Sequence, residues 1–127
     1  MGRRVAVVDD DRDIRDALRG ALTDEGYEVT VVPNGLRLLA ALQVDKPDLI
    51  VLDVMMSWID GFELCKAIKR NSDYQKIPVL FISAKSSQED ITHGLQCGAI
   101  DYVTKPFDLP TLLEKIERIV GPPPLGG

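Results

Sequence analysis

The run Leu49-Ile50-Val51-Leu52-Asp53 narrows the choice of fold more than any other part of the chain. Its first four residues are apolar with no polar residue between them, which is typical of a strand buried on both faces inside a parallel sheet. A second run of this kind, Val79-Leu80-Phe81-Ile82, ends at Ser83. Because helices must cover both faces of such a sheet, we expect strands and helices to alternate along the rest of the chain.

The segments on either side show this alternation. Short β-rich runs predict further strands at residues 5–8, 27–32 and 100–104. Apolar residues spaced by three and four predict helices around residues 14–22, 36–42, 62–68, 87–97 and 109–120. We therefore expect one α/β domain over residues 1–121 with five parallel strands. The Pro- and Gly-rich segment 122–127 is expected to be a flexible tail or the start of a linker.

The composition is that of a soluble globular domain. Of the 127 residues, 45% are hydrophobic and 28% are charged, and the formal net charge is −5. This acidity argues against direct binding to nucleic acid, whose phosphates are neutralised by Lys and Arg. No apolar run approaches the ~18 residues that a membrane span needs. Cys65 and Cys97 are typical of reduced, packed thiols, so we expect a cytoplasmic protein.

Chemically active side chains stand where the predicted strands end. Asp9-Asp10-Asp11 follows the first strand, Asp53 the third, Ser83 the fourth and Lys105 the fifth. The carboxyl ends of parallel strands meet at one edge of a sheet, so these side chains should converge. Carboxylates brought together repel one another, and Mg²⁺ relieves that repulsion. With a lysine and a hydroxyl for phosphate oxygens, the set predicts a phosphoryl site in which Asp53 is the nucleophile.

Each of these residues has an ordinary explanation when it is taken alone. An aspartate run can cap a helix, and an aspartate after a strand can belong to a turn. Ser83 can also cap a helix, and a lysine such as Lys105 is most often solvated. The site is favoured because all of them fall at the same end of the predicted sheet. The single histidine, His93, could be a phosphorelay residue, but it is more often an exposed polar residue in such a context.

Together with Asp60-Gly61 and the run Asp101-Tyr102-Val103-Thr104-Lys105-Pro106-Phe107, this set resembles the receiver domain of bacterial two-component response regulators. The likeness covers roughly residues 3–120. It implies a flavodoxin-like, doubly wound (βα)5 fold with the strand order 2-1-3-4-5. It also implies that Asp53 accepts a phosphoryl group from the phosphohistidine of a histidine kinase or phosphotransfer protein, or from a small phosphodonor.

The resemblance implies a role for each matching residue. Asp10, Asp53 and the backbone carbonyl of Met55 would hold Mg²⁺, and Asp9 would support the ion through water. Lys105 would contact one phosphoryl oxygen.

Two further residues would form a switch. Ser83 would donate a hydrogen bond to another phosphoryl oxygen, and Tyr102 would swing inward as Ser83 moves. The Lys105-Pro106 peptide is expected to be cis, as it often is in this family. Ser57 and Trp58 depart from the family pattern, in which a proline is common at position 57.

The resemblance also implies partners. The surface formed by the fourth helix, the fifth strand and the fifth helix would dock an effector or a second copy of the chain. An alternative is a degenerate receiver that binds a partner without phosphorylation, but such domains typically lose one of the site residues. A phosphatase on a similar sheet would need a second aspartate where Met55 stands. We therefore expect no enzyme activity beyond the domain's own phosphoryl transfer and slow autodephosphorylation.

Overall fold

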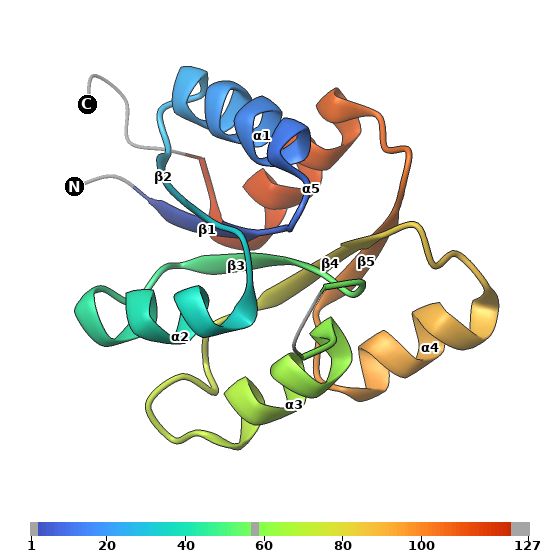
Figure 1. The fold of residues 1–127 in the computed structure, drawn as a ribbon. Helices are drawn as coiled ribbons and strands as arrows, with labels where there is room; N and C mark the ends of the chain where they lie inside the picture. The colour runs from blue at the N-terminus through green and yellow to red at the C-terminus, as the bar shows by residue number, and fades with distance from the viewer. Residues whose placement is uncertain (1–2, 57–58, 123–127) are drawn as a thin grey trace.

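The computed structural model describes residues 3–56 and 59–122. In these residues five parallel strands form one sheet in the order β2-β1-β3-β4-β5 (Figure 1). The strands are β1 (Arg4–Val8), β2 (Glu28–Val32), β3 (Leu49–Asp53), β4 (Val79–Ser83) and β5 (Asp101–Thr104). The predicted fold class and strand order are confirmed.

A helix follows each strand. The helices are α1 (Arg12–Asp24), α2 (Gly35–Val44), α3 (Gly61–Arg70), α4 (Gln88–Gln96) and α5 (Leu109–Val120). Figure 1 shows α1 and α5 on one face of the sheet and α2, α3 and α4 on the other. All residues of β3 and β4 are buried, as their unbroken apolar runs predict.

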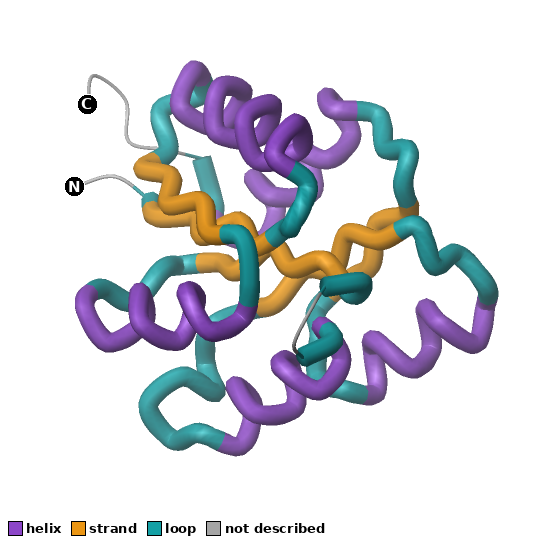
Figure 2. The backbone as a smooth tube through the Cα atoms, viewed as in Figure 1, coloured by secondary structure: helices purple, strands orange, loops and turns teal. Residues whose placement is uncertain are grey.

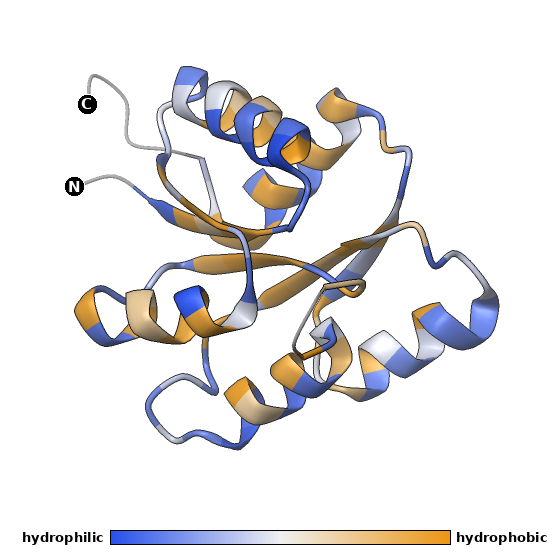
Figure 3. Cartoon of the chain, in the orientation of Figure 1, coloured by the Kyte–Doolittle hydropathy of each residue, from blue (hydrophilic) through white to orange (hydrophobic). Residues whose placement is uncertain are grey.

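The core has two layers, because successive side chains of a strand point to opposite faces. Val51 and Leu80 pack with Leu18 of α1 and Leu112 of α5. On the other face, residues such as Leu52 and Phe81 pack with the apolar sides of α2 and α3. Figure 3 shows this pattern as apolar colour along the strands. The sheet is thus a rigid base for the loops that follow the strands, two of which, β4–α4 and β5–α5, stand out on the right in Figure 2.

The predicted element ends are right to within a few residues. Tyr27 was expected in the second strand but precedes it, because its N–H closes the end of α1 on the carbonyl of Leu22. Gly26 makes this ending possible with φ of +98°. Ile100 likewise precedes β5.

Three other expectations concern the cysteines, the tail and the membrane. Cys65 and Cys97 are free and buried, as expected, and the Cys65 thiol lies 3.5 Å from the carbonyl oxygen of Cys97. The predicted tail falls outside the described residues apart from position 122, and so do Ser57 and Trp58. Among the described residues, none of the helices combines the length and the apolar character that crossing a bilayer requires.

Candidate functional site

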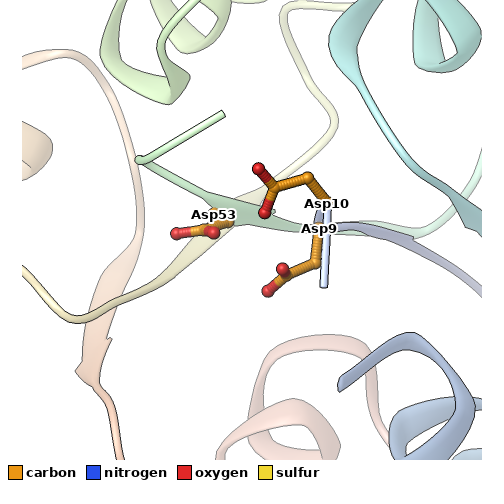
Figure 4. Close-up of side chains that lie close together, drawn as sticks. All are labelled: Asp9, Asp10 and Asp53. Carbon is orange, nitrogen blue, oxygen red and sulfur yellow. The ribbon is translucent and has the colours of Figure 1, made fainter. Parts of the chain in front are cut away.

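Three carboxylates from two neighbouring strands meet at the carboxyl edge of the sheet. Asp9 and Asp10 follow β1, and Asp53 is the last residue of β3. One oxygen from each lies within 4.8 Å of the others, an arrangement that could hold a metal ion. Figure 4 shows the Asp9 and Asp10 side chains at the end of β1, beside that of Asp53 on β3. Asp9 and Asp53 are buried, whereas Asp10 is exposed.

The third aspartate of the run has a different role. Asp11 is the N-cap of α1 and accepts a hydrogen bond from the N–H of Asp13 at 2.9 Å. Its own N–H donates to Asp9 Oδ1 at 2.9 Å, which ties the helix start to the site. The capping interpretation is therefore correct for Asp11, while Asp9 and Asp10 belong to the carboxylate group.

Lys105 reaches the same carboxylates from the end of β5. Its Nζ lies 2.8 Å from Asp9 Oδ2 and 3.3 Å from Asp53 Oδ2. Only 19% of the side chain is exposed, so Lys105 is not the solvated lysine of the ordinary interpretation. Burial lowers its pKa, but the hydrogen bond to Asp9 and the charges of both carboxylates outweigh burial and raise it. The Lys105-Pro106 peptide that follows is cis, as expected.

The surroundings of the Asp53 carboxylate favour a bound cation. Burial and, after it, the charge of Asp9 raise its pKa to about 6, against the opposing effects of Lys105 and the N–H of Met55. Its negative charge is therefore unfavourable in this buried setting, and a bound metal ion would neutralise it. Two buried carboxylates beside an exposed third give the all-oxygen ligand set that Mg²⁺ prefers. These residues fit that ion.

The side chains of Ser83 and Tyr102 both form hydrogen bonds with the backbone of Lys85. Ser83 is fully buried and follows Ile82, which pairs with Asp53 across the sheet. Its Oγ accepts the N–H of Lys85 at 3.1 Å, and the Tyr102 hydroxyl donates to the carbonyl of Lys85 at 2.6 Å. Tyr102 as a whole residue is 8% exposed and is therefore already buried. The expected inward movement on phosphorylation stays a prediction.

Met55 and His93 complete the predicted set. The Met55 N–H donates to Asp53 Oδ1 at 3.2 Å, and the residue is 52% exposed. Coordination by its carbonyl stays a prediction. His93 is an exposed residue of α4, with its ring centroid 4.3 Å from that of Phe62.

Two residues that hold the site were not predicted. A Cβ atom on Gly61 would lie 2.3 Å from the carbonyl oxygen of Asp53, so only glycine lets α3 begin so close to β3. The pair Asp60-Gly61 was visible in the sequence, but nothing local indicates this contact. The guanidinium of Arg15 donates to the carbonyl oxygen of Asp9 at 2.8 Å, and no spacing rule predicts that contact either.

Comparisons with known proteins agree with this geometry. The family described as the response regulator receiver domain matches residues 5–117. Transcriptional regulatory protein CseB of Streptomyces coelicolor is 41% identical over 116 residues, which make up 91% of this chain and 48% of CseB. Response regulator MprA of Mycobacterium tuberculosis is 39% identical over 120 residues, or 94% of this chain and 51% of MprA. The chain thus spans about half the length of these curated relatives.

Solved structures agree over the whole sheet. Chemotaxis protein CheY4 of Vibrio cholerae superposes with a TM-score of 0.88 at 35% identity, covering 94% of this chain and 99% of that one. A putative response regulator from Chloroflexus aurantiacus gives a TM-score of 0.89 at 29% identity, with 94% and 98% of the two chains covered. The likeness therefore includes every strand that contributes a residue to the site.

Proposed function

The chain belongs to the response regulator receiver domains of two-component signalling, and from this premise we propose that Asp53 accepts a phosphoryl group in a Mg²⁺-dependent reaction. One observation carries the proposal. Asp9, Asp10 and Asp53 offer oxygens within 4.8 Å of one another, and Lys105 lies 2.8 Å from Asp9 and 3.3 Å from Asp53. The degenerate alternative is not supported, because the residues that such a domain would lack are all present.

The proposed transfer uses the Asp53 carboxylate as nucleophile. One Asp53 oxygen forms a bond to phosphorus while the bond from phosphorus to the phosphohistidine nitrogen breaks, and the imidazole leaves. Asp10, Asp53 and the Met55 carbonyl would hold Mg²⁺, with Asp9 in support. When bound, the ion neutralises the negative charge gathered on the carboxylates and the phosphoryl oxygens.

Lys105 and Ser83 receive the transferred group. Lys105 exchanges part of its contact with the carboxylates for a phosphoryl oxygen, and its ammonium carries mobile donors suited to this. The Ser83 oxygen, which accepts the N–H of Lys85, moves toward the phosphoryl group, and its O–H donates a hydrogen bond to another phosphoryl oxygen. Because the Tyr102 hydroxyl donates to the carbonyl of the same Lys85, a movement of Ser83 changes the position of Tyr102 on β5.

The proposed partners act on either side of this step. A histidine kinase or a phosphotransfer protein supplies the phosphoryl group. The surface of α4, β5 and α5 passes the signal to an effector or to a second copy of the chain. The domain's own chemistry would be limited to accepting the group and to slow hydrolysis of the aspartyl phosphate. Met55 and Lys85, both exposed beside the site, would slow the approach of water.

The test is phosphorylation by a small phosphodonor, followed by intact-mass measurement. With acetyl phosphate and Mg²⁺, the protein should gain the mass of one phosphoryl group, and a chelator should prevent the gain. Asp53→Asn should abolish it. Asp11→Asn is the matched control, because Asn is as good an N-cap and Asp11 lies outside the carboxylate group. Equal phosphorylation of Asp53→Asn and the wild type would overturn the proposal.

A further inference from the structure

The backbone carbonyl of Asp9 has an unusual partner. Val8 is the last residue of β1, so this carbonyl lies beyond the sheet ladder, in a residue with no exposed surface. Within the described residues, the donor that reaches it is the Arg15 guanidinium, at 2.8 Å from the second turn of α1. A buried carbonyl needs such a partner, because leaving it without one is unfavourable.

The other polar groups of Asp9 are held as well. Its N–H donates to the carbonyl of Val32 at 3.2 Å. Its carboxylate accepts the N–H of Asp11 at 2.9 Å and the ammonium of Lys105 at 2.8 Å. Arg15 therefore supplies the remaining restraint, and it acts on the peptide that joins Asp9 to Asp10. The orientation of that peptide sets the position of the Asp10 Cα atom and the direction in which the exposed side chain leaves it.

We propose that Arg15 is a positioning residue for the metal site. By holding the peptide between Asp9 and Asp10, it directs the Asp10 carboxylate toward Asp9 and Asp53. The inference rests on the proposed function, and it adds a residue that touches neither the metal ion nor the phosphoryl group. Groups that orient metal ligands in this way typically change metal affinity by about tenfold or more when they are removed.

The direction in which Mg²⁺ affinity changes when Arg15 is removed shows whether Arg15 acts by positioning Asp10 or only by its charge. Arg15 brings a positive charge to the backbone of Asp9, whose side chain is one of the three carboxylates of the site. If only that charge mattered, removing it would strengthen Mg²⁺ binding, because cations repel each other. If Arg15 positions Asp10, removing it weakens binding despite the more negative surroundings. The two explanations therefore predict opposite changes.

The experiment is calorimetric titration of the metal-free protein with Mg²⁺. We expect Arg15→Met, which keeps the apolar stem and removes the donors, to bind Mg²⁺ about tenfold more weakly than the wild type. Arg19→Met is the matched control: it removes the same charge one turn further along α1 from an exposed residue. It should bind as tightly as the wild type or slightly more tightly. Arg15→Lys keeps the charge and a donor, and it should fall between the wild type and Arg15→Met.

A second readout follows from the same idea. In phosphorylation by acetyl phosphate, Arg15→Met should need more Mg²⁺ for half-maximal rate, while the rate at saturating Mg²⁺ should stay within about twofold of the wild type. A merely structural defect would also lower the rate at saturating Mg²⁺. Should Arg15→Met fail to fold, Arg15→Lys carries the test alone, and affinity equal to that of the wild type would overturn the proposal.

The outcomes are distinguishable from failure of the proposed function. If the wild type binds Mg²⁺ and Arg15→Met binds it as tightly as Arg19→Met does, positioning by Arg15 is wrong and the phosphorylation proposal stands. If the wild type binds no Mg²⁺, the phosphorylation proposal fails, and this inference fails with it.

Discussion

Asp53 is unfavourable for folding when it is ionised and no metal is bound. Burial, and after it the charge of Asp9, raise its pKa to about 6, whereas an aspartate in an unfolded chain titrates near ~3.9. The folded protein therefore holds this proton more tightly than the unfolded chain does. The contribution of protonated Asp53 to the free energy of unfolding is fully present below about pH 4 and is lost as the pH rises through about 6.

Asp53→Asn should therefore stabilise the metal-free protein in a pH-dependent way. At pH 7.5 with a chelator, we expect its free energy of unfolding in urea to exceed that of the wild type by about 1–2 kcal/mol. The difference should shrink toward zero below about pH 4, and added Mg²⁺ should favour the wild type instead. Asp73→Asn removes an exposed carboxylate and should show no such dependence. A constant difference at all pH values would contradict the assignment.

The aspartate run shows how far residue-scale prediction reaches. The sequence places Asp9, Asp10 and Asp11 together, and both the site and the capping interpretation were available for all of them. The structure divides the roles, with Asp9 buried against Lys105, Asp10 exposed and Asp11 capping α1. Identical side chains one residue apart cannot be told apart by type. Their roles depend on the direction in which the chain leaves β1, and that direction is set by tertiary contacts.

At the scale of elements, the start of α3 is pressed against the end of β3. The N–H of Gly61 donates to the carbonyl of Val54 at 2.8 Å. A Cβ atom at position 61 would lie 2.3 Å from the Asp53 oxygen and 2.8 Å from the Cα atom of Val54. Both neighbours are backbone atoms, which cannot move aside as a flexible side chain can. A shift of the start of α3 would therefore move the backbone of Asp53 and, with it, the proposed phosphorylation site.

Gly61→Ala should disturb both stability and the site. Overpacking of this kind typically costs about 1–3 kcal/mol, so we expect a loss of that size in the free energy of unfolding. Mg²⁺ binding should weaken too, because the Asp53 backbone must shift. Gly20→Ala is the matched control: position 20 is exposed on α1 with nothing within 4 Å of the added carbon. It should stabilise the protein by about 0.5–1 kcal/mol. If Gly61→Ala left the free energy of unfolding unchanged, the start of α3 could move away from β3 without loss of stability, and the prediction would be wrong.

Elements were predicted better than the contacts between them. The buried strands β3 and β4 follow from unbroken apolar runs, and α5 follows from its regular apolar spacing. Both signals depend on neighbours in the sequence. The approach of Gly61 to β3 and the reach of Arg15 to Asp9 involve no such periodicity. They appear only when the chain has folded, which is why the sequence revealed the reactive groups but not the residues that hold them.

At the scale of the whole molecule, the order of the strands came from family resemblance. Periodicity indicates parallel strands, but no local pattern states which strands are neighbours. The order matters because it places β1, which carries Asp9 and Asp10, beside β3, and β4 between β3 and β5. The site on β1 and β3 is thereby connected through Ser83 to Tyr102 on β5.

This connection can be weighed against the energy that a switch needs. Moving a two-state equilibrium from 1:99 to 99:1 takes ~5.5 kcal/mol. A phosphoryl group can form one to three charge-assisted hydrogen bonds, each worth about 1.5–3 kcal/mol. In the proposed mechanism, the bonds of Lys105 and Ser83 to the phosphoryl group would together supply about the required amount, and neither would suffice alone. Loss of the Ser83 bond, at about 2 kcal/mol, would lower the ratio from about 99:1 to about 3:1.

Ser83→Ala should therefore separate phosphorylation from the response. We expect it to gain the phosphoryl group to the same extent as the wild type, because Asp53, the proposed metal ligands and Lys105 are unchanged. The amide NMR shifts of α4 and β5 on phosphorylation should be smaller, since fewer molecules reach the active state. Ser83→Thr is the control, because it keeps the hydroxyl and should restore the shifts. Full-sized shifts in phosphorylated Ser83→Ala would mean that the signal leaves the site by another route, with Lys105 the remaining contact to the phosphoryl group.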